Sequence, residues 1–216
     1  MAREQTGGRG RRGRSWVSPA GLGLYLSVLL RPTGLEAALV PRLTVLSAVA
    51  ARRGILGATG LSADIKWPND LWMSGLKLGG ILAEGSADSV VIGIGLNMGP
   101  DLPQELEGLA TSLSREKGRV VDSEPVLQEV TRQLLDLYRR WREQGFGSGV
   151  WDRLMEEYRE ASILLGRPVR VITGREEYGG LAQDVDEDGR LLVRVGPGDV
   201  RALSSADVSV RPDRPL

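Results

Sequence analysis

The sequence contains no cysteine and no histidine. Zinc sites built from Cys and His, disulfides, cysteine nucleophiles, Ser-His-Asp triads and imidazole bases are therefore excluded from this chain. No stretch of about 18 apolar residues occurs, and no apolar segment follows the first residues, so we expect neither a membrane span nor a secretory signal. The expected location is the cytoplasm.

Lysine is also scarce, since only three of the 28 basic residues are lysines, at positions 66, 77 and 117, and the other 25 are arginines. The 28 basic residues balance 28 acidic ones. With 41% hydrophobic and 26% charged residues, the composition is that of a folded globular protein. The length of 216 residues predicts one full domain and a small second one.

The hydrophobic pattern of the first half predicts a sheet with at least one covering helix. Residues 22–32 form an apolar run bounded by prolines, which is typical of a buried strand. A helix is expected over 41–53, with Gly54 just past its end. Further strands are expected at 65–67, 71–73, 76–85 and 89–98.

The second half begins with a polar segment at 100–122 that reads as a linker. Apolar residues at helical spacing then predict helices over 124–144 and from about Ser148 to Ser162. After Gly166 the sequence changes to short alternating runs separated by turn residues, which predict a small barrel-like β-domain.

The first segment that can carry chemistry is the arginine-rich loop, GGRGRRGRSW at residues 7–16. Its glycines free the backbone to wrap an anion, and its forked guanidinium groups match carboxylate and phosphate oxygens. A loop that clamps such a group is one interpretation. The other is a solvated Arg-Gly segment that binds nucleic acid without sequence preference.

The second segment is KWPND at residues 66–70, which places a cation, an amide and a carboxylate around a proline-fixed turn. These groups suit a triphosphate with its divalent metal, although Pro-Asn-Asp is also an ordinary turn sequence.

Two glycine-containing runs complete the set of motifs. In LKLGGILAE, Lys77 stands in an apolar strand ahead of two glycines, and this pairing indicates a close approach to the backbone. In GIGLNMG, Met98 stands where the third glycine of a dinucleotide-binding loop would be, so a Rossmann fold is rejected. Asn97 could instead place an amide against a ligand.

In their order and spacing, GRGRRGRSWVSP, KWPNDL, KLGGILAE and IGIGLN resemble one family, the biotin protein ligases. The resemblance extends over nearly the whole chain. It implies an α+β fold in which a mixed or antiparallel sheet with covering helices, of the biotin/lipoate ligase and class II synthetase type, occupies residues 1–164. A small SH3-like β-barrel would follow at 165–216.

The resemblance further implies ATP-dependent attachment of biotin to one lysine of a biotin carboxyl carrier protein through biotinyl-5′-AMP. Mg²⁺ would be held mainly by the phosphates of ATP, with Asn69 or Asp70 as candidate further ligands. The implied catalytic residues are Lys77, Asp70 and Arg11. Biotin would contact Gln5, Arg9, Gly10, Arg11, Lys77 and Gly80, and ATP would contact Arg14, Trp16, Lys66, Asn69, Asp70 and Asn97.

One departure from the family pattern lies at the N-terminus, where the family has a helix, strands and a biotin-contacting segment before the arginine-rich loop. We therefore expect a truncated chain with an exposed sheet edge, and either low stability or association with another chain, such as a homodimer. No helix-turn-helix can be placed in the chain, so a repressor function is not supported.

Three alternative functions stay open at this point: a lipoate-type protein ligase, an Arg-Gly nucleic-acid-binding module, and a folded remnant that binds without catalysing. The arginine-rich loop combined with KWPND favours biotin over lipoate. The zero net charge and the lack of aromatic residues between the arginines weigh against nucleic acid.

Overall fold

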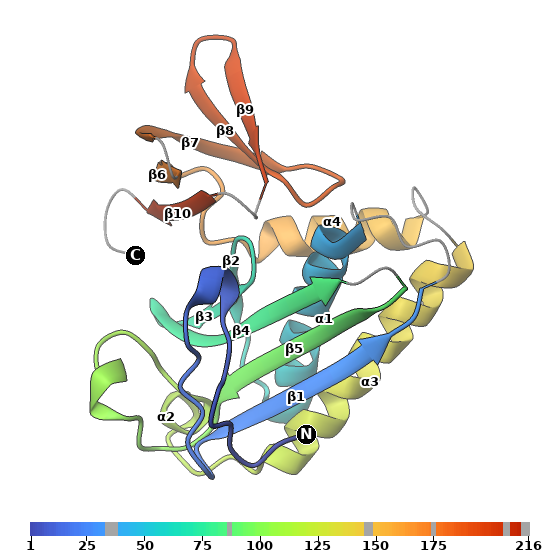
Figure 1. Ribbon diagram of the computed structural model, residues 1–216, viewed down its shortest axis with the longest axis vertical. Coiled ribbons are helices and arrows are strands. Elements are labelled where there is room, and N and C mark those ends of the chain that lie inside the picture. Colours follow the sequence, from blue (N-terminus) through green and yellow to red (C-terminus); the bar gives the residue numbers. More distant parts are fainter. Residues whose placement is uncertain (33–38, 86–87, 145–148, 174–175, 205–207, 213–216) are drawn as a thin grey trace.

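The computed structural model describes residues 1–32, 39–85, 88–144, 149–173, 176–204 and 208–212 (Figure 1). Its first part contains β1 (Gly23–Leu30), α1 (Leu39–Thr59), β2 (Asp64–Lys66), β3 (Asp70–Met73), β4 (Leu76–Gly85), β5 (Val90–Asn97), α2 (Leu113–Lys117), α3 (Ser123–Gln144) and α4 (Gly149–Glu160). Short 3-10 turns lie at Arg11–Gly13 and Gln104–Leu106. The C-terminal part contains β6 (Pro168–Thr173), β7 (Glu177–Val185), β8 (Leu191–Gly196), β9 (Asp199–Leu203) and β10 (Val208–Pro212).

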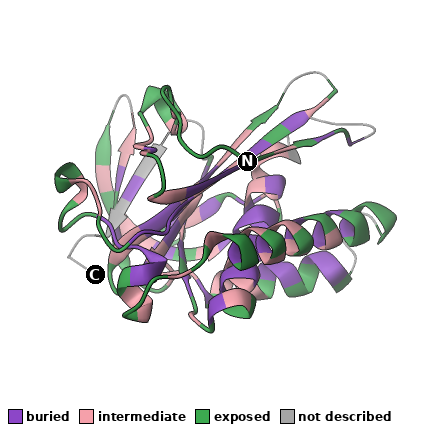
Figure 2. Ribbon diagram, turned by 90° about the horizontal axis from the view of Figure 1, so that it is seen from below, coloured by how far each residue is buried: buried purple, intermediate pink, exposed green. Residues whose placement is uncertain are grey.

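The first five strands form one antiparallel sheet in the order β1-β5-β4-β3-β2. Along β5, Ile92, Ile94 and Leu96 alternate with more exposed residues and are buried under the helices. This alternation follows from the two-residue period of a strand. The long helices cover only the face of the sheet that carries these three residues. Figure 2 shows that the helices are buried where they contact one another and the sheet, and exposed on their outer sides. The opposite face of the sheet is left for the site.

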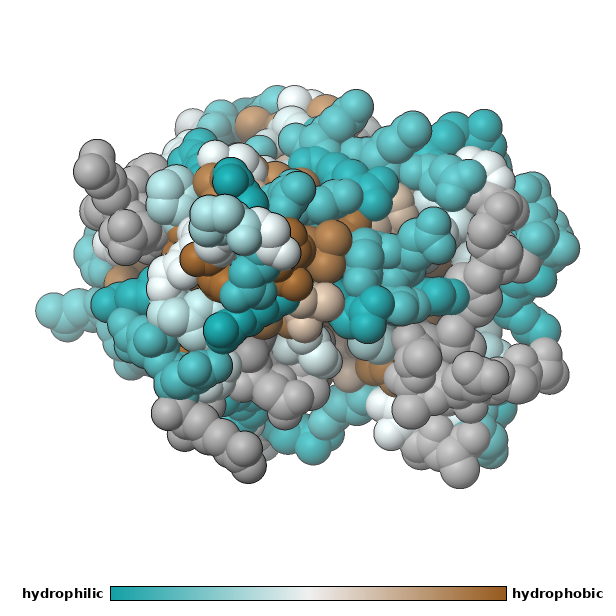
Figure 3. Space-filling model, turned by 90° about the horizontal axis from the view of Figure 1, so that it is seen from above, coloured by the Kyte–Doolittle hydropathy of each residue, from teal (hydrophilic) through white to brown (hydrophobic). Residues whose placement is uncertain are grey.

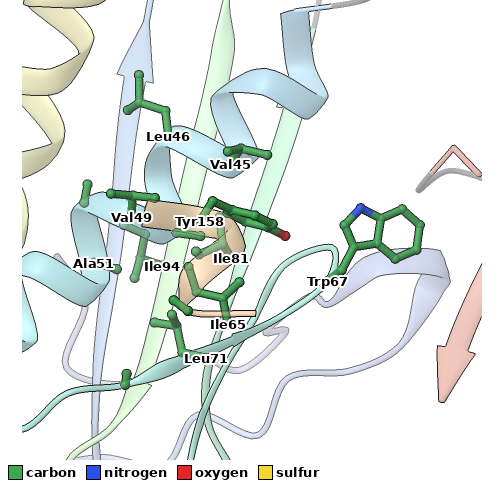
Figure 4. Packing of buried hydrophobic residues seen from close by; sticks show 14 of the residues in the cluster. Val45, Leu46, Val49, Ala51, Ile65, Trp67, Leu71, Ile81, Ile94 and Tyr158 are labelled. Carbon is green, nitrogen blue, oxygen red and sulfur yellow. The ribbon is translucent and has the colours of Figure 1, made fainter. Parts of the chain in front are cut away.

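The core between the sheet and α1 is made of aliphatic side chains. Leu46 and Val49 of α1 meet Ile81 and Ile94 of the sheet (Figure 4). The prediction that these two isoleucines belong to the core is confirmed, since they are 1% and 2% exposed. Trp67 points away from this group, and its indole nitrogen donates a hydrogen bond of 2.9 Å to the Gly189 carbonyl of the C-terminal sheet.

The predicted end of the first helix is wrong, because α1 continues through Gly54 to Thr59. A Cβ on Gly54 would lie 2.6 Å from the Cα of Val130 in α3. Gly54 therefore allows α1 and α3 to approach closely. It does not mark the end of a helix, as the sequence pattern predicts.

Replacing Gly54 tests this explanation of the helix. We expect Gly54→Ala to lower the free energy of unfolding by about 1–3 kcal/mol, because backbone atoms of α3 cannot yield to the added methyl group. Gly57→Ala is the matched control: its Cβ would meet only the flexible side chain of Glu129, at 3.1 Å. That variant should be neutral or more stable, since alanine favours a helix over glycine by about 1 kcal/mol. Urea unfolding of both variants makes the comparison, and equal losses would contradict the packing argument.

The other predicted elements agree with the structure in most places. The strands of the first sheet and the helix at 124–144 are confirmed, and α4 matches the second predicted helix, although Ser148 lies outside the described residues. The linker prediction for 100–122 is wrong, because this segment contains α2 with Leu113 and Ser114 buried. Its capping serine, Ser112, accepts a hydrogen bond from the Arg115 amide, as an N-cap should.

The C-terminal strands form a second antiparallel sheet, in the order β10-β6-β7-β8-β9. It meets the first part through ion pairs between Arg42 and Asp188, at 2.6 Å, and between Arg159 and Asp184, at 2.7 Å. Seen from above the view of Figure 1, this face of the molecule is mostly hydrophilic, and its hydrophobic residues gather mainly near the centre (Figure 3). Among the described residues, no helix is both long and apolar enough to cross a membrane.

The first residues run beside β1, which is an edge strand of the first sheet. The Ala2 amide donates to the Tyr25 carbonyl at 2.9 Å, and Leu29 further along β1 is 49% exposed. An exposed edge was expected from the sequence, and its consequence for stability or association stays a prediction.

Candidate active site

The site lies on the uncovered face of the first sheet, where one row of residues crosses the five strands. The pairing register places Tyr25 opposite Gly95, Gly95 opposite Gly80, Gly80 opposite Asp70, and Asp70 opposite Lys66. Residues paired across strands share a face of the sheet. Because the two central members are glycines, the row has a gap in its side chains at its middle.

Trp16 fills this gap. A Cβ on Gly95 would lie 2.7 Å from Cε2 and Nε1 of the Trp16 ring, and one on Gly80 would lie 3.4 Å from its Cζ3. The indole therefore lies directly on the backbone of β4 and β5. This contact within the protein requires a glycine at position 95, whereas a Cβ on Gly80 would make only an ordinary van der Waals contact with the indole.

Lys77 reaches the same face because β4 contains an irregularity. Between β3 and β4 the register shifts: Leu71 pairs with Gly79, but Trp72 pairs with Lys77. The extra residue reverses the side-chain alternation on one side of the bulge. The Lys77 ammonium consequently lies 2.8 Å from the Asp70 carboxylate and 5.3 Å from the centre of the Trp16 ring.

The arginine-rich loop folds back over this face as an ordered hairpin-like turn (Figure 1). The Trp16 amide donates to the Gly8 carbonyl at 2.9 Å, and the Gly10 amide donates to the Arg14 carbonyl at 2.7 Å. Arg11 donates a hydrogen bond of 3.1 Å to Oδ1 of Asn69, which joins the loop to the KWPND turn.

Two further contacts fix the ends of this loop. Arg9 forms an ion pair of 3.1 Å with Glu84, although both side chains are largely exposed. Gln5 accepts a hydrogen bond of 2.8 Å from the Ser18 hydroxyl. Because an exposed ion pair contributes at most about 1 kcal/mol, Arg9 remains available to an anionic ligand.

Together these segments enclose a cleft of about 580 Å³. The volume is in the range of small-molecule sites. Nearly all the residues predicted from the sequence line it: Gln5, Arg9, Gly10, Arg11, Arg14, Trp16, Asn69, Asp70, Lys77, Gly80 and Asn97. The four motifs, far apart in the chain, are thus brought to one place.

Lys66 is the exception, since it is not among the residues that line the cleft. It shares a sheet face with Asp70, but its ammonium lies 4.2 Å from the centre of the Trp72 ring. A lysine and an aromatic residue on the diagonal of an antiparallel pair are close enough for this contact.

Asn97 lines the cleft but is mainly turned toward the protein. It is 7% exposed, and its amide nitrogen donates to the Thr111 carbonyl at 3.0 Å. The sequence predicts that the Asn97 amide contacts a ligand. In the structure this amide instead binds the backbone of the cleft wall.

Sequence reasoning missed the wall that follows β5. Leu106, Leu109 and Ala110 line the cleft, and they come from the segment read as a linker. Leu109 is 66% exposed. The only available signal was this sparse apolar pattern in a polar stretch, which no periodicity supports.

Burial changes the pKa of two groups close to Asp70, Arg11 in the cleft and Tyr158 in the core. Burial lowers the pKa of Arg11, and the neighbouring Asp70 carboxylate partly offsets that effect. Burial also raises the pKa of Tyr158, and the same carboxylate adds to the rise. The Tyr158 hydroxyl lies beneath the KWPND turn and donates to the Pro68 carbonyl at 3.3 Å.

The raised pKa of Tyr158 has a consequence at high pH. Above the unfolded value near 10, the unfolded chain releases the phenolic proton while the folded chain keeps it. This contribution to stability is therefore full below pH 10 and is lost as the pH rises further. We expect the wild type to lose up to about 1.4 kcal/mol more per pH unit than Tyr158→Phe. Urea unfolding from pH 8 to 11 tests this, and parallel curves would contradict it.

The described residues offer no cluster of three or more His, Cys, Asp or Glu side chains around a common point. At the cleft, Asp70 is bound to Lys77 and Asn69 to Arg11. These oxygens fit a metal that arrives with its own anionic ligands, and they do not form a cage for one.

Comparisons with known proteins match nearly the whole chain to one family. The family model for the biotin/lipoate A/B protein ligase family matches residues 1–100, and that for the biotin protein ligase C terminal domain matches residues 164–211. The bifunctional ligase/repressor BirA of Bacillus subtilis is 37% identical over 97% of this chain. The chain spans 65% of the length of that relative.

Two other similar proteins are covered more fully. The biotin–[acetyl-CoA-carboxylase] ligase of Mycobacterium tuberculosis is 34% identical over 96% of this chain and 77% of its own length. The structure of the biotin protein ligase from Aquifex aeolicus in complex with biotin and ATP is similar, with a TM-score of 0.85 and 28% identity. That match covers 98% of this chain and 87% of the other.

Proposed function

The chain belongs to the biotin protein ligase family, and from that premise we propose that it attaches biotin to a lysine of a biotin carboxyl carrier protein, with ATP as the second substrate. The observation that carries the proposal is the meeting of four motifs in one cleft, around the ion pair of Lys77 and Asp70. The solved relatives that hold biotin, ATP or biotinyl-5-AMP support the choice of substrates.

In the first step, the biotin carboxylate attacks the α-phosphorus of ATP, which gives biotinyl-5′-AMP and releases pyrophosphate. A carboxylate is ionised at neutral pH, so this step requires no base, and the absence of histidine is no obstacle. Lys77 would lie between the biotin carboxylate and the α-phosphate and stabilise the charge that develops there. Arg11, held by Asn69, would add a second cation.

In the second step, the amine of the carrier lysine attacks the acyl carbon, and AMP leaves. The ammonium of the carrier lysine must first lose a proton to become a nucleophile. Asp70 is the proposed acceptor because it is the carboxylate in the row of paired residues and lies beside Lys77. The other cleft carboxylate, Glu84, pairs with Arg9. The Lys77 ammonium, at 2.8 Å, would then compete with the incoming proton for the same oxygen.

The remaining predicted residues are proposed to bind the substrates. Biotin would contact Gln5, which precedes the arginine-rich loop, Arg9 and Gly10 within that loop, and Gly80 of β4. ATP would contact Arg14, whose side chain lines the cleft without an ion-pair partner among the described residues. Trp16, Asn69, Asp70 and Asn97 complete that side, and Lys66 would act from its rim.

Mg²⁺, carried mainly by the phosphates of ATP, would neutralise the departing pyrophosphate. The apolar wall of Leu106, Leu109 and Ala110 suits a flat purine ring. We also propose a cytoplasmic location, where ATP and carboxylase carriers occur, and a homodimer, which size-exclusion chromatography with light scattering tests.

The experiment is ATP–pyrophosphate exchange with biotin, and with lipoate as the control acid. We expect exchange with biotin alone, followed by transfer of biotin to an isolated carrier domain. Exchange with lipoate alone would replace the proposal by a lipoate-type ligase. Biotin binding without exchange, from folded protein, would identify a non-catalytic remnant.

A further inference from the structure

Lys77 is held from outside the sheet by the segment that follows β5. The Thr111 amide donates to the Lys77 carbonyl at 2.9 Å, and the Lys77 amide donates to the Leu109 carbonyl at 3.3 Å. The Asn97 amide binds the Thr111 carbonyl from the other side. The backbone of the cationic residue and the apolar wall of the cleft are thus one hydrogen-bonded unit.

Glu116 of α2 binds this unit to the turn between β3 and β4. Its Oε1 accepts from the Thr111 hydroxyl and its Oε2 accepts from the Ser74 hydroxyl, both at 2.6 Å. Thr111 is 2% exposed, so one of the two bonds is shielded from water. Hydrogen bonds to a carboxylate are about twice as strong as neutral ones.

The Ser74 end of this bridge has an unusual backbone. Ser74 and Gly75 have φ values of 51° and 78°, so both residues of the hairpin turn are in the left-handed region. Such turns favour asparagine or aspartate ahead of glycine, and serine is a poor choice by conformation alone. The bond from its hydroxyl to Glu116 accounts for the serine.

We propose that Glu116 is a positioning residue, which fixes Lys77 and the Leu109–Thr111 wall relative to each other by binding the two hydroxyls on either side of them. The proposal rests on the proposed function, since it assigns the nucleotide side of that cleft to this bridge. Glu116 does not line the cleft itself and would touch no substrate.

The bridge should affect the two substrates differently. Apart from Lys77 and Gly80, the groups proposed to hold biotin come from the N-terminal segment, and none of the contacts described above joins that segment to α2. The wall and the Lys77 backbone, by contrast, are both bound through Thr111. Loss of the bridge should therefore weaken ATP binding and slow adenylation, with little change in the KM for biotin.

The test is Glu116→Ala, assayed by pyrophosphate exchange with each substrate varied in turn. We expect kcat/KM for ATP to fall about tenfold or more, with the KM for biotin within about twofold. Glu116→Gln should recover most of the loss, because an amide can accept from one hydroxyl and donate to the other. Thr111→Val should reproduce the defect and Thr111→Ser should not. Ser74→Gly removes the hydroxyl but relaxes the turn, and it should still lower kcat/KM for ATP.

Asp136→Ala is the matched control, since it removes a carboxylate paired with Arg139 and Arg140 on α3, outside the cleft lining. Equal increases in both KM values, or an unchanged kcat/KM for ATP in Glu116→Ala, would overturn the proposal. If the wild type shows no exchange, the proposed function fails by itself. Hydrogen exchange at the Thr111 amide, faster in Glu116→Ala but not in Glu116→Gln, then decides the positioning role, and equal rates would reject it.

Discussion

Lys77→Ala is expected to reduce biotin-dependent pyrophosphate exchange by roughly 10²–10³-fold, the range found when a preorganised donor to developing charge is removed. In the structure this ammonium is already fixed, by the β4 bulge and by its ion pair of 2.8 Å with Asp70. It requires no rearrangement to meet an anion in the cleft. Lys77→Arg should not restore the rate, because the longer planar guanidinium cannot occupy the position of a compact ammonium.

A simpler explanation for such a loss must be separated from this one. Removing Lys77 leaves Asp70 half-buried without its cation, and the new repulsion could keep anionic substrates away. The double variant Lys77→Ala/Asp70→Asn removes that charge. If repulsion were the cause, the double variant would recover the exchange rate of Asp70→Asn alone, whereas a lysine that stabilises the transition state predicts that it stays far below that rate.

Lys117→Ala controls for the loss of a lysine as such. The Lys117 ammonium donates to the Thr59 carbonyl at 2.6 Å, near the last turn of α1, and it does not line the cleft. Stability should fall slightly, and exchange should stay within about twofold of the wild type. Near-normal exchange in Lys77→Ala itself would remove Lys77 from the reaction.

Lys77 lies in the cleft and Lys117 does not, and the sequence predicts only part of what causes this difference. The period-two and 3.6-residue patterns predicted the strands of the first sheet and the presence of the long helices, although not the end of α1, because burial on one face dictates these patterns. Nearly all the residues that the motifs predicted for the site line the cleft, but Tyr25, Ser27 and Glu84 line it as well and were not predicted. The exchange of face at Lys77 depends on one extra residue in the pairing with β3, and no local pattern in β4 records it.

Local sequence patterns also do not reveal why a glycine is required at a position, because the reason depends on which group packs against it. The sequence predicts a helix end at Gly54, which is instead a helix contact, and it predicts a close approach at Gly79 and Gly80 without indicating which group approaches. The wall at 106–110 was missed because an irregular segment that lines a cleft has neither periodicity nor buried area to mark it.

Gly95→Ala is expected to lower kcat/KM for adenylation about 100-fold while the protein stays folded. The new methyl group would lie 2.7 Å from two atoms of the Trp16 ring, so the indole must leave the sheet. A shift of about 1 Å at a substrate-positioning surface can cost this much. Gly93→Ala, two residues along the same strand and face, is the control, because its nearest contact would be 3.6 Å, to the Leu82 carbonyl. It should lose less than about tenfold.

The route of this effect can be tested by a double-mutant cycle with Trp16→Ala. If Gly95 matters only because the indole must lie on it, then Gly95→Ala should cause no further loss once the indole is gone, and the two effects will be strongly non-additive. If instead both changes add, the glycine itself contacts a substrate, and Trp16 is not the floor of the cleft. The result distinguishes a glycine required for packing within the protein from one required for contact with the ligand. The sequence GIGLN alone is compatible with both.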